Sequence, residues 1–179
     1  MRKFIISIDA GTTSNRSILF DLKGKPIFSS QKEFTQYFPK SGWVEHNPDE
    51  IWKTTIKTLK NVIQKAKKLK GKILSIGITN QRETTVLWDK KTGKPVYKAI
   101  VWQDRRQEEF CKKLRKQNKE TMIFNKTGLL IDSYFSGTKI KWILDNIPKA
   151  RQLMNKKQLL FGTIDSFLIW RLTKGKVHA

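Results

Sequence analysis

Residues 4–20 read Phe4-Ile-Ile-Ser-Ile-Asp-Ala-Gly-Thr-Thr-Ser-Asn-Arg-Ser-Ile-Leu-Phe20. Residues 4–8 and 17–20 are rich in β-branched and aromatic residues, and the polar run between them contains a glycine. This pattern predicts two antiparallel strands joined by a turn. Residues 21–26 carry a second turn signal and residues 27–34 a third strand pattern. The sequence therefore predicts a three-stranded meander at the start of the chain.

A helix start follows at Asn47-Pro-Asp-Glu50. Asn47 can cap the helix, Pro48 suits its first position, and Glu50 is placed to reach back as in a capping box. Lysines precede Gly71, which we expect to be the left-handed residue that ends the helix. An apolar stripe then recurs at steps of three and four residues and predicts the buried face: Trp52, Ile56, Leu59, Ile63 and Ala66.

Strand and helix patterns alternate beyond Gly71. Residues 73–78 are almost continuously apolar, which is typical of a strand buried on both faces of a sheet. The remaining patterns predict strands at 84–88, 99–102 and 159–161 and helices at 103–119, 138–144 and 162–170. This order favours one α/β domain with a mixed β-sheet flanked by helices.

The chain is strongly basic. Its 179 residues include 37 Lys and Arg against 15 Asp and Glu, a formal net charge of +22, and 29 of the 37 basic residues are lysine. Nucleic-acid-binding proteins usually gather arginines and aromatic residues in one stripe, whereas these lysines are spread from Lys3 to Lys176. We therefore expect no nucleic-acid partner, although such a surface would attract polyphosphates.

The composition also bears on the class and location of the protein. Hydrophobic residues make up 38% of the chain, enough for a folded core, and no apolar run reaches the roughly 18–20 residues of a membrane span. The one cysteine, Cys111, cannot form an internal disulfide, and no Cys/His cluster has zinc-ligand spacing. These features favour a cytoplasmic protein.

The loop from Asp9 to Arg16 could hold a polyphosphate. Gly11 leaves the backbone accessible, hydroxyl donors follow it, Arg16 adds a positive charge, and Asp9 could hold magnesium, through water. The hydroxyls belong to Thr12, Thr13 and Ser14. The residues alone do not separate this phosphate site from an ordinary polar hairpin turn.

A second polar cluster, Asn80-Gln-Arg-Glu-Thr-Thr85, follows the apolar strand at the place where open α/β sheets bind ligands. Arg82 offers donors beside the acceptors of Glu83, which suits a small polyol. Trp102 could lie against the polyol carbon chain and Tyr134 could offer its hydroxyl. Taken by themselves, however, the residues favour a surface ion pair at Arg82–Glu83 and aromatic side chains that belong only to the core or its rim.

Six motifs together resemble those of the FGGY carbohydrate kinases: residues 9–16, Gly42-Trp-Val-Glu-His46, Gly77-Ile-Thr-Asn-Gln-Arg-Glu-Thr-Thr85, Ala99-Ile-Val-Trp-Gln103, Tyr134-Phe-Ser-Gly-Thr138 and Leu160-Phe-Gly-Thr163. They occur in order from Ile5 to Val177 with family-like spacing. The second and third are similar to the branch that phosphorylates glycerol, not to the pentulose kinases.

The resemblance implies an actin-like, ribonuclease-H-like ATPase fold, with two domains and the substrates in the cleft between them. It further implies that Thr12, Thr13, Ser14 and Arg16 contact the phosphates of ATP and that Asp9 lies on the Mg²⁺ side. Arg82, Glu83 and Tyr134 would hydrogen-bond glycerol, and Trp102 would pack against it. The chain departs from the family at Ala10 and Asn15, where relatives often have Gln and Ser.

A larger departure concerns catalysis. The family places its catalytic base, an aspartate, in a Gly-Asp-Gln motif, and residues 1–179 contain no such motif. We therefore expect residues 1–179 to be the N-terminal domain of such a kinase, without the adenosine-binding C-terminal domain, and to be inactive alone. The resemblance implies that the complete enzyme converts glycerol and ATP to glycerol 3-phosphate and ADP, and we expect it to be a homo-oligomer.

Three alternatives remain open at this point. The chain could belong to a sister kinase that acts on a pentulose, or it could be a non-catalytic module that binds a polyol or a nucleotide. The third alternative is a nucleic-acid-binding protein, whose affinity would fall steeply with salt.

Overall fold

The computed structural model describes all of residues 1–179 and divides them into two compact units. Unit 1 contains Met1–Gln36, His46–Gln81 and Thr163–Ala179, and unit 2 contains Tyr37–Glu45 and Arg82–Gly162. No helix of the chain combines the length and the apolar composition that crossing a membrane requires.

Unit 1 is built on a four-stranded sheet of order β3-β2-β1-β5. The strands are β1 (Arg2–Ala10), β2 (Ser14–Asp21), β3 (Pro26–Glu33) and β5 (Gly71–Asn80). The first three pair antiparallel, which confirms the predicted meander, and β5 pairs parallel to β1, so the sheet is mixed as expected. The carboxyl ends of β1 and β5 therefore lie at the same edge, with Ala10 opposite Asn80.

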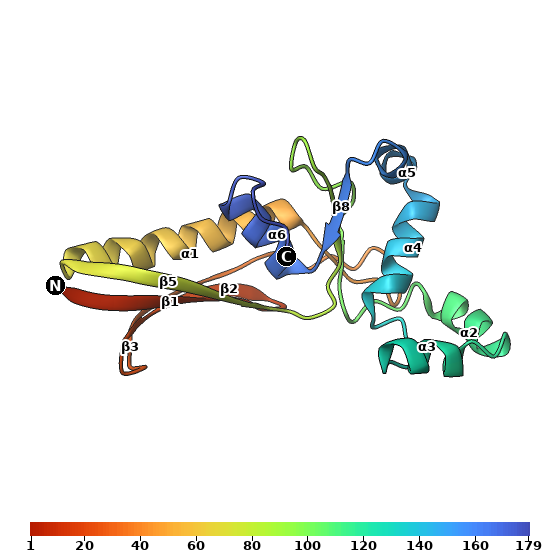
Figure 1. Ribbon diagram of the computed structural model, residues 1–179, viewed down its shortest axis with the longest axis horizontal. Coiled ribbons are helices and arrows are strands. Elements are labelled where there is room, and N and C mark those ends of the chain that lie inside the picture. The colour runs from red at the N-terminus through yellow and green to blue at the C-terminus, as the bar shows by residue number, and fades with distance from the viewer. The chain divides into compact units, whose positions relative to one another are not determined.

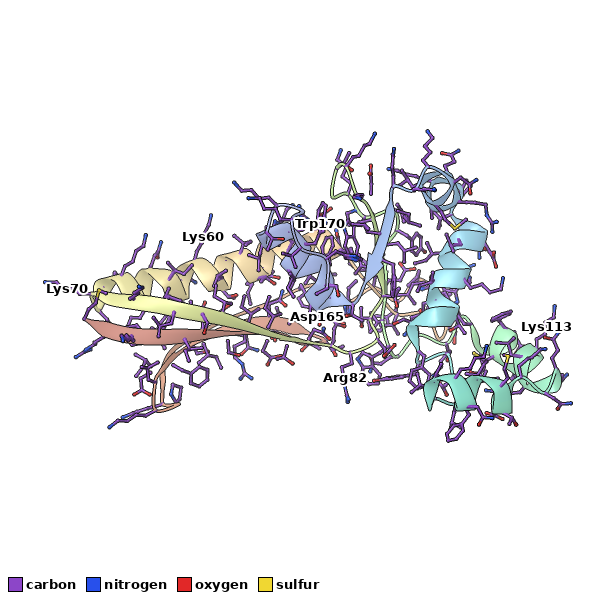
Figure 2. The ribbon with its side chains drawn as sticks, viewed as in Figure 1. Lys60, Lys70, Arg82, Lys113, Asp165 and Trp170 are labelled. Atoms are coloured by element: carbon purple, nitrogen blue, oxygen red, sulfur yellow. The ribbon has the colours of Figure 1, made fainter.

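Helix α1 (Pro48–Lys68) runs along this sheet (Figure 1), and α6 (Ile164–Leu172) belongs to the same unit. Residues of β1, β2 and α1 form its core: Phe4, Ile6, Ile8, Leu19, Leu59, Val62 and Ala66. Lysines occupy the solvent side of the helix, and Figure 2 shows Lys60 projecting away from it. In this helix, therefore, the lysines form a face that is exposed to solvent.

The buried face of α1 differs from the predicted stripe. Leu59 and Ala66 are buried as expected, but Trp52, Ile56 and Ile63 are only half-buried. The interior positions are taken instead by Ile51, Thr55 and Val62, one position before each of them, and by Thr54 and Thr58. Hydrogen bonds explain the rotation, because Asn15 Nδ2 donates to Thr54 Oγ1 at 2.5 Å and Ser17 Oγ lies 2.9 Å from Thr58 Oγ1. A prediction of the buried face from apolar residues alone leaves out these threonines, whose hydroxyls can be buried because residues of β2 form hydrogen bonds with them.

The ends of α1 follow the predicted signals in part. Asn47 Oδ1 accepts from the Asp49 amide at 3.0 Å, which confirms the cap. The capping-box expectation for Glu50 is wrong, since its carboxylate accepts instead from the amide and hydroxyl of Thr35. The left-handed residue is Lys70, with φ of 52°, and not Gly71. Gly71 is required for another reason, because a Cβ there would lie 2.1 Å from the Phe4 ring.

Strand β5 is not buried on both faces, so that prediction is wrong. Leu74 is 48% exposed and Ile76 is 44% exposed. The reason is position, because β5 is the edge strand of the sheet and only its Ile73 and Ile78 side chains pack against the core of unit 1. A continuous apolar run indicates a strand but does not by itself say how many faces are covered.

Unit 2 contains shorter elements. Its strands are β6 (Val86–Asp89), β7 (Ala99–Ile100) and β8 (Leu159–Gly162), and its helices are α2 (Glu108–Lys116), α3 (Glu120–Thr127), α4 (Ser136–Asn146) and α5 (Pro148–Asn155). Strand β8 pairs antiparallel with β6, and β4 (Glu45–His46), which spans the boundary between the units, pairs with β7. The core of unit 2 is centred on Leu87, Ile100, Ile143 and Ala150.

The helices of unit 2 depart most from the sequence patterns. The helix predicted over 103–119 covers only Glu108–Lys116, because Asp104 accepts from the Arg106 amide and holds the preceding residues in a turn. Asn118, with φ of 55°, ends the segment, and α3 and α5 were not predicted at all. The strand at Leu159 and the helices near 138–144 and 162–170 are confirmed.

Candidate functional site

The turn between β1 and β2 has its carbonyl groups tied back to the body of unit 1. Gln81 donates to the carbonyls of Ala10, through its amide at 2.8 Å, and of Gly11, through Nε2 at 3.1 Å. The Thr12 carbonyl accepts from Gln36 Nε2 at 3.1 Å, and the Thr13 carbonyl accepts from the Phe34 amide at 3.3 Å. A loop whose carbonyls are held in this way can offer amides and hydroxyls to an anion without exposing competing negative dipoles.

Gly11 leaves little room for a side chain at the head of this turn. Its amide donates to the Ser14 carbonyl at 3.0 Å, and an added Cβ would lie 3.3 Å from that same oxygen. The Ser14 hydroxyl accepts from Gln31 Nε2 at 2.9 Å, which leaves the hydroxyl hydrogen available for another acceptor. The turn is therefore compact and bears hydroxyls, as the phosphate-loop interpretation requires.

A buried histidine supports this loop from behind. Gln36 uses its Nε2 to donate to Thr12 and Phe34, so its Oε1 must accept, and His46 Nε2 lies 2.5 Å from that oxygen. His46 therefore carries its proton on Nε2, while its buried Nδ1 has no hydrogen-bond partner. Burial lowers the pKa of His46 from 6.5 to about 4, although the nearby Glu50 charge opposes the shift. His46 is thus a neutral structural group near the loop and not a proton donor at neutral pH.

Asp9 and Arg16 face each other across the β1–β2 pair. Arg16 Nη2 donates to Asp9 Oδ2 at 3.1 Å, and both side chains are partly exposed, at 46% and 38%. Solvent screens such a pair, so it holds the two groups only weakly and either can change partner. A cation and a carboxylate are therefore available beside the hydroxyl-bearing turn.

The donor set fits Mg²⁺ only as part of a nucleotide complex. No group of three or more Asp, Glu, His or Cys side chains is arranged so that it could hold a metal ion by itself. Mg²⁺ commonly binds through one or two carboxylates, several waters and the phosphates of its substrate, so the lone carboxylate of Asp9 is sufficient for that role.

In unit 2, Glu83 has an uncommon backbone conformation. Its φ is 63°, in the left-handed region that non-glycine residues rarely adopt. Its carboxylate Oε2 accepts from the amide and the hydroxyl of Ser136, at 2.9 and 2.8 Å, at the N-terminus of α4. No group of the protein donates to Oε1, so one carboxylate oxygen is fixed and the other can accept from a ligand. Outliers of this kind are typical of functional sites.

The structure brings two more predicted polyol residues together. The rings of Trp102 and Tyr134 meet edge to face with centroids 6.1 Å apart, and both side chains are partly exposed. The Trp102 amide donates to Thr84 Oγ1 at 3.3 Å, next to Glu83 in the chain. Arg82 is exposed and makes no ion pair, and Figure 2 shows its side chain extended from the ribbon. The surface-ion-pair interpretation of Arg82–Glu83 is therefore wrong, since Glu83 is bound to Ser136.

Sequence reasoning missed the supporting residues of both clusters. Gln36, Gln81 and His46 hold the β1–β2 turn, and Ser136 and Lys139 hold the Glu83 segment. Ser136 lies inside a quoted motif, but nothing in its local pattern indicates a carboxylate partner 53 residues away. Only the tertiary structure reveals such pairs.

Comparisons with known proteins show which family the chain resembles over nearly its whole length. A family model described as the FGGY family of carbohydrate kinases, N-terminal domain, matches residues 4–179. The glycerol kinase of Malacoplasma penetrans is 58% identical over 178 residues, 99% of this chain and 35% of that protein. The glycerol kinase of Oceanobacillus iheyensis is 59% identical over 176 residues, 98% of this chain and 35% of that protein. The chain thus spans about a third of the length of these curated relatives.

Solved structures give the same result. Plasmodium falciparum glycerol kinase with ADP superposes with a TM-score of 0.92 at 37% identity, covering 97% of this chain and 35% of that chain. Gluconate kinase from Lactobacillus acidophilus superposes with a TM-score of 0.82 at 23% identity, covering 96% and 33%, and so supports the fold alone. The α/β fold class with a mixed sheet and flanking helices is confirmed.

Proposed function

Because this chain belongs to the FGGY family of carbohydrate kinases, we propose that it supplies the phosphate-binding loop and the polyol-binding residues of a glycerol kinase. In this proposal the complete enzyme transfers the γ-phosphoryl group of ATP to a terminal hydroxyl of glycerol, giving sn-glycerol 3-phosphate and ADP. Residues 1–179 act as the N-terminal domain, the adenosine is held elsewhere, and the enzyme works in the cytoplasm.

The arrangement around Glu83 is the observation that carries the proposal. The backbone of Glu83 is in the left-handed region, and Ser136 binds one of its carboxylate oxygens while the other is available to a ligand. Together with the Trp102–Tyr134 pair and the exposed Arg82, this carboxylate offers the contacts that a small polyol needs. Each polyol hydroxyl both donates and accepts, so it needs a donor and an acceptor nearby. The high identity to glycerol kinases, rather than to other sugar kinases of the same fold, supports glycerol as the polyol.

The proposed roles follow from the chemistry of each side chain. Arg82 donates to glycerol, Glu83 accepts through Oε1, Tyr134 adds a hydroxyl, and Trp102 covers the carbon chain. In unit 1, the hydroxyls of Thr12, Thr13 and Ser14 donate to phosphate oxygens and Arg16 offsets their charge.

Positioning and charge neutralisation account for most of the catalysis of phosphoryl transfer. Asp9 would hold Mg²⁺, which when bound neutralises charge on the phosphates. Arg16 is then free to leave Asp9 for a phosphate oxygen, because their ion pair is partly exposed. The polyol residues fix the hydroxyl that is to be phosphorylated.

The first prediction concerns glycerol binding. The variant Glu83→Gln should bind glycerol about tenfold more weakly than the parent chain, since hydrogen bonds to a charged group contribute roughly 1.5–3 kcal/mol. Saturation-transfer NMR with glycerol, ribulose and xylulose measures the affinities. The exposed variant Glu109→Gln, which breaks only a surface pair with Lys112, is the control and should bind as the parent does.

Two results would contradict the proposal. Tighter binding of a pentulose than of glycerol by the parent chain would favour a sister sugar kinase. Equal glycerol affinity in the parent chain and in Glu83→Gln would remove Glu83 from the site.

The second prediction concerns turnover by the 179 residues alone. They contain no Gly-Asp-Gln motif, the place where the family resemblance puts the catalytic base. Loss of such an acid–base group commonly costs 10²–10⁴ in rate, so a coupled ADP-release assay with glycerol and MgATP should give only background. Glycerol-dependent ADP release above background would show that the base lies within this chain.

A further inference from the structure

Lys139 on α4 is a fully buried lysine that no part of the proposed chemistry uses. Its ammonium donates to the carbonyl of Glu83 at 2.9 Å and also to the carbonyl of Tyr134. The same ammonium lies 5.8 Å from the centroid of the Tyr134 ring. One side chain therefore joins the backbones of two residues that are 51 positions apart in the sequence and that both carry proposed polyol contacts.

Both carbonyls accept from this ammonium, and the Glu83 carbonyl also accepts from the Thr85 hydroxyl at 3.2 Å. Of these donors only Lys139 is charged, and hydrogen bonds from a charged group are the strongest kind. Ser136, one turn earlier on the same face of α4, holds the Glu83 carboxylate. Helix α4 thus donates hydrogen bonds to both the carbonyl and the carboxylate of Glu83, and these bonds hold the residue in the left-handed conformation.

We propose that Lys139 is a positioning residue for polyol binding, whose ammonium sets the separation of Glu83 and Tyr134 so that both side chains meet one glycerol molecule. This inference rests on the proposed function. Lys139 itself does not touch the polyol; it acts through the backbone of its two partners.

The charge of Lys139 can be changed within a convenient pH range. Burial lowers its pKa from 10.5 to about 8, while the charges of Glu83, Asp104 and Asp132 act to raise it and that of Arg105 acts to lower it. Below pH 8 the group is an ammonium, and above pH 8 it is an amine whose two hydrogen bonds are weaker. As the pH rises through 8, the hydrogen bonds from Lys139 to the carbonyls of Glu83 and Tyr134 should therefore weaken but not break.

Two measurements on the parent chain test the inference without any substitution. Carbonyl ¹³C shifts of Glu83 and Tyr134 should titrate together with a midpoint near pH 8. The dissociation constant for glycerol, measured by saturation-transfer NMR, should rise several-fold between pH 7 and pH 9. A buried lysine that only supports the fold would not link glycerol affinity to this titration.

Two variants provide a second test of the role of Lys139. Lys139→Met keeps the length of the side chain and removes the donor, so glycerol affinity at pH 7 should fall about ten- to a hundredfold and its pH dependence should vanish. The matched control is Lys141→Met, two residues further on the same helix, where an exposed lysine pairs with Asp145. It should leave both the affinity and its pH profile unchanged.

The outcomes separate the inference from the function on which it rests. If the parent chain binds glycerol with the same affinity at pH 7 and pH 9, and Lys139→Met binds as tightly as the parent, the inference is wrong and the function stands. If the parent chain binds no glycerol, the proposed function fails and the inference with it. Should Lys139→Met not fold, the titration of the parent chain still decides.

Discussion

Replacement of Asp104 by alanine is expected to lower the free energy of unfolding of unit 2 by about 3–5 kcal/mol, the usual cost of removing one partner from a buried ion pair. Asp104 is completely buried. Its Oδ1 accepts from the amide and Nε of Arg106, both at 2.9 Å, and its Oδ2 accepts from Nη2 of Arg106 at 2.8 Å and from the Val44 amide at 2.7 Å. The substitution therefore breaks four hydrogen bonds at once.

The substitution would leave the buried charge of Arg106 without its main partner. Its side chain is fully buried and lies over the rings of Trp43, at 3.7 Å, and Trp142, at 4.6 Å. Burial opposes its charge, but the hydrogen bonds and charge of Asp104 outweigh it and raise the pKa of Arg106. Without Asp104, only Glu45 Oε1, at 2.9 Å, would remain to balance a guanidinium that cannot lose its proton.

Urea unfolding followed by tryptophan fluorescence measures this effect, because Trp43 and Trp142 adjoin Arg106. Glu109→Gln is again the matched control and should be indistinguishable from the parent chain, since its ion pair with Lys112 is exposed. An Asp104→Ala variant as stable as the parent would mean that the Asp104–Arg106–Glu45 cluster is dispensable for folding.

The second large effect is a loss of stability in mild acid that depends on His46. Burial lowers the pKa of His46 from 6.5 to about 4 in the folded chain, so between these values the unfolded chain binds more protons. Stability therefore rises with pH through that window, is fully present above about pH 6.5 and is lost as the pH falls toward 4. The shift corresponds to about 3 kcal/mol for unit 1.

Protonation is costly because of where the second proton must go. Nε2 already holds the proton that Gln36 accepts, so the new proton goes to Nδ1, which is buried and makes no hydrogen bond in the folded chain. The Glu50 charge and the Gln81 side chain favour the protonated form, but burial outweighs them and lowers the pKa of His46. A positive charge is then placed in the interior of unit 1, next to the ring of Phe34.

Unfolding free energies at pH 7 and pH 4.5, compared between the parent chain and two variants, measure the effect. His46→Gln should be less stable at pH 7 but should lose much less between the two pH values. His178→Gln, a change near the exposed end of the chain, should follow the parent chain. If His46→Gln loses as much stability as the parent, other groups cause the acid sensitivity.

The sequence predicted the two ligand-binding clusters to different degrees. Asp9, Gly11 and the hydroxyl residues are contiguous, so their joint position in a turn follows from the strands on either side. Glu83, Trp102 and Tyr134 lie far apart in the sequence, and only the family resemblance suggested that they meet. The roles of His46 and Lys139 could not be predicted, because a buried cation or imidazole has no periodic signal.

The amino-acid sequence alone determined the meander, the start of α1 and the alternation of strands and helices, because alternation, capping and turn chemistry act between near neighbours. Tertiary structure decided which face of α1 is buried, that β5 lies at an edge, and that Ser136 and Lys139 grip Glu83. These depend on partners tens of residues away, and hydrogen bonds between such partners leave no trace in the local pattern of either one.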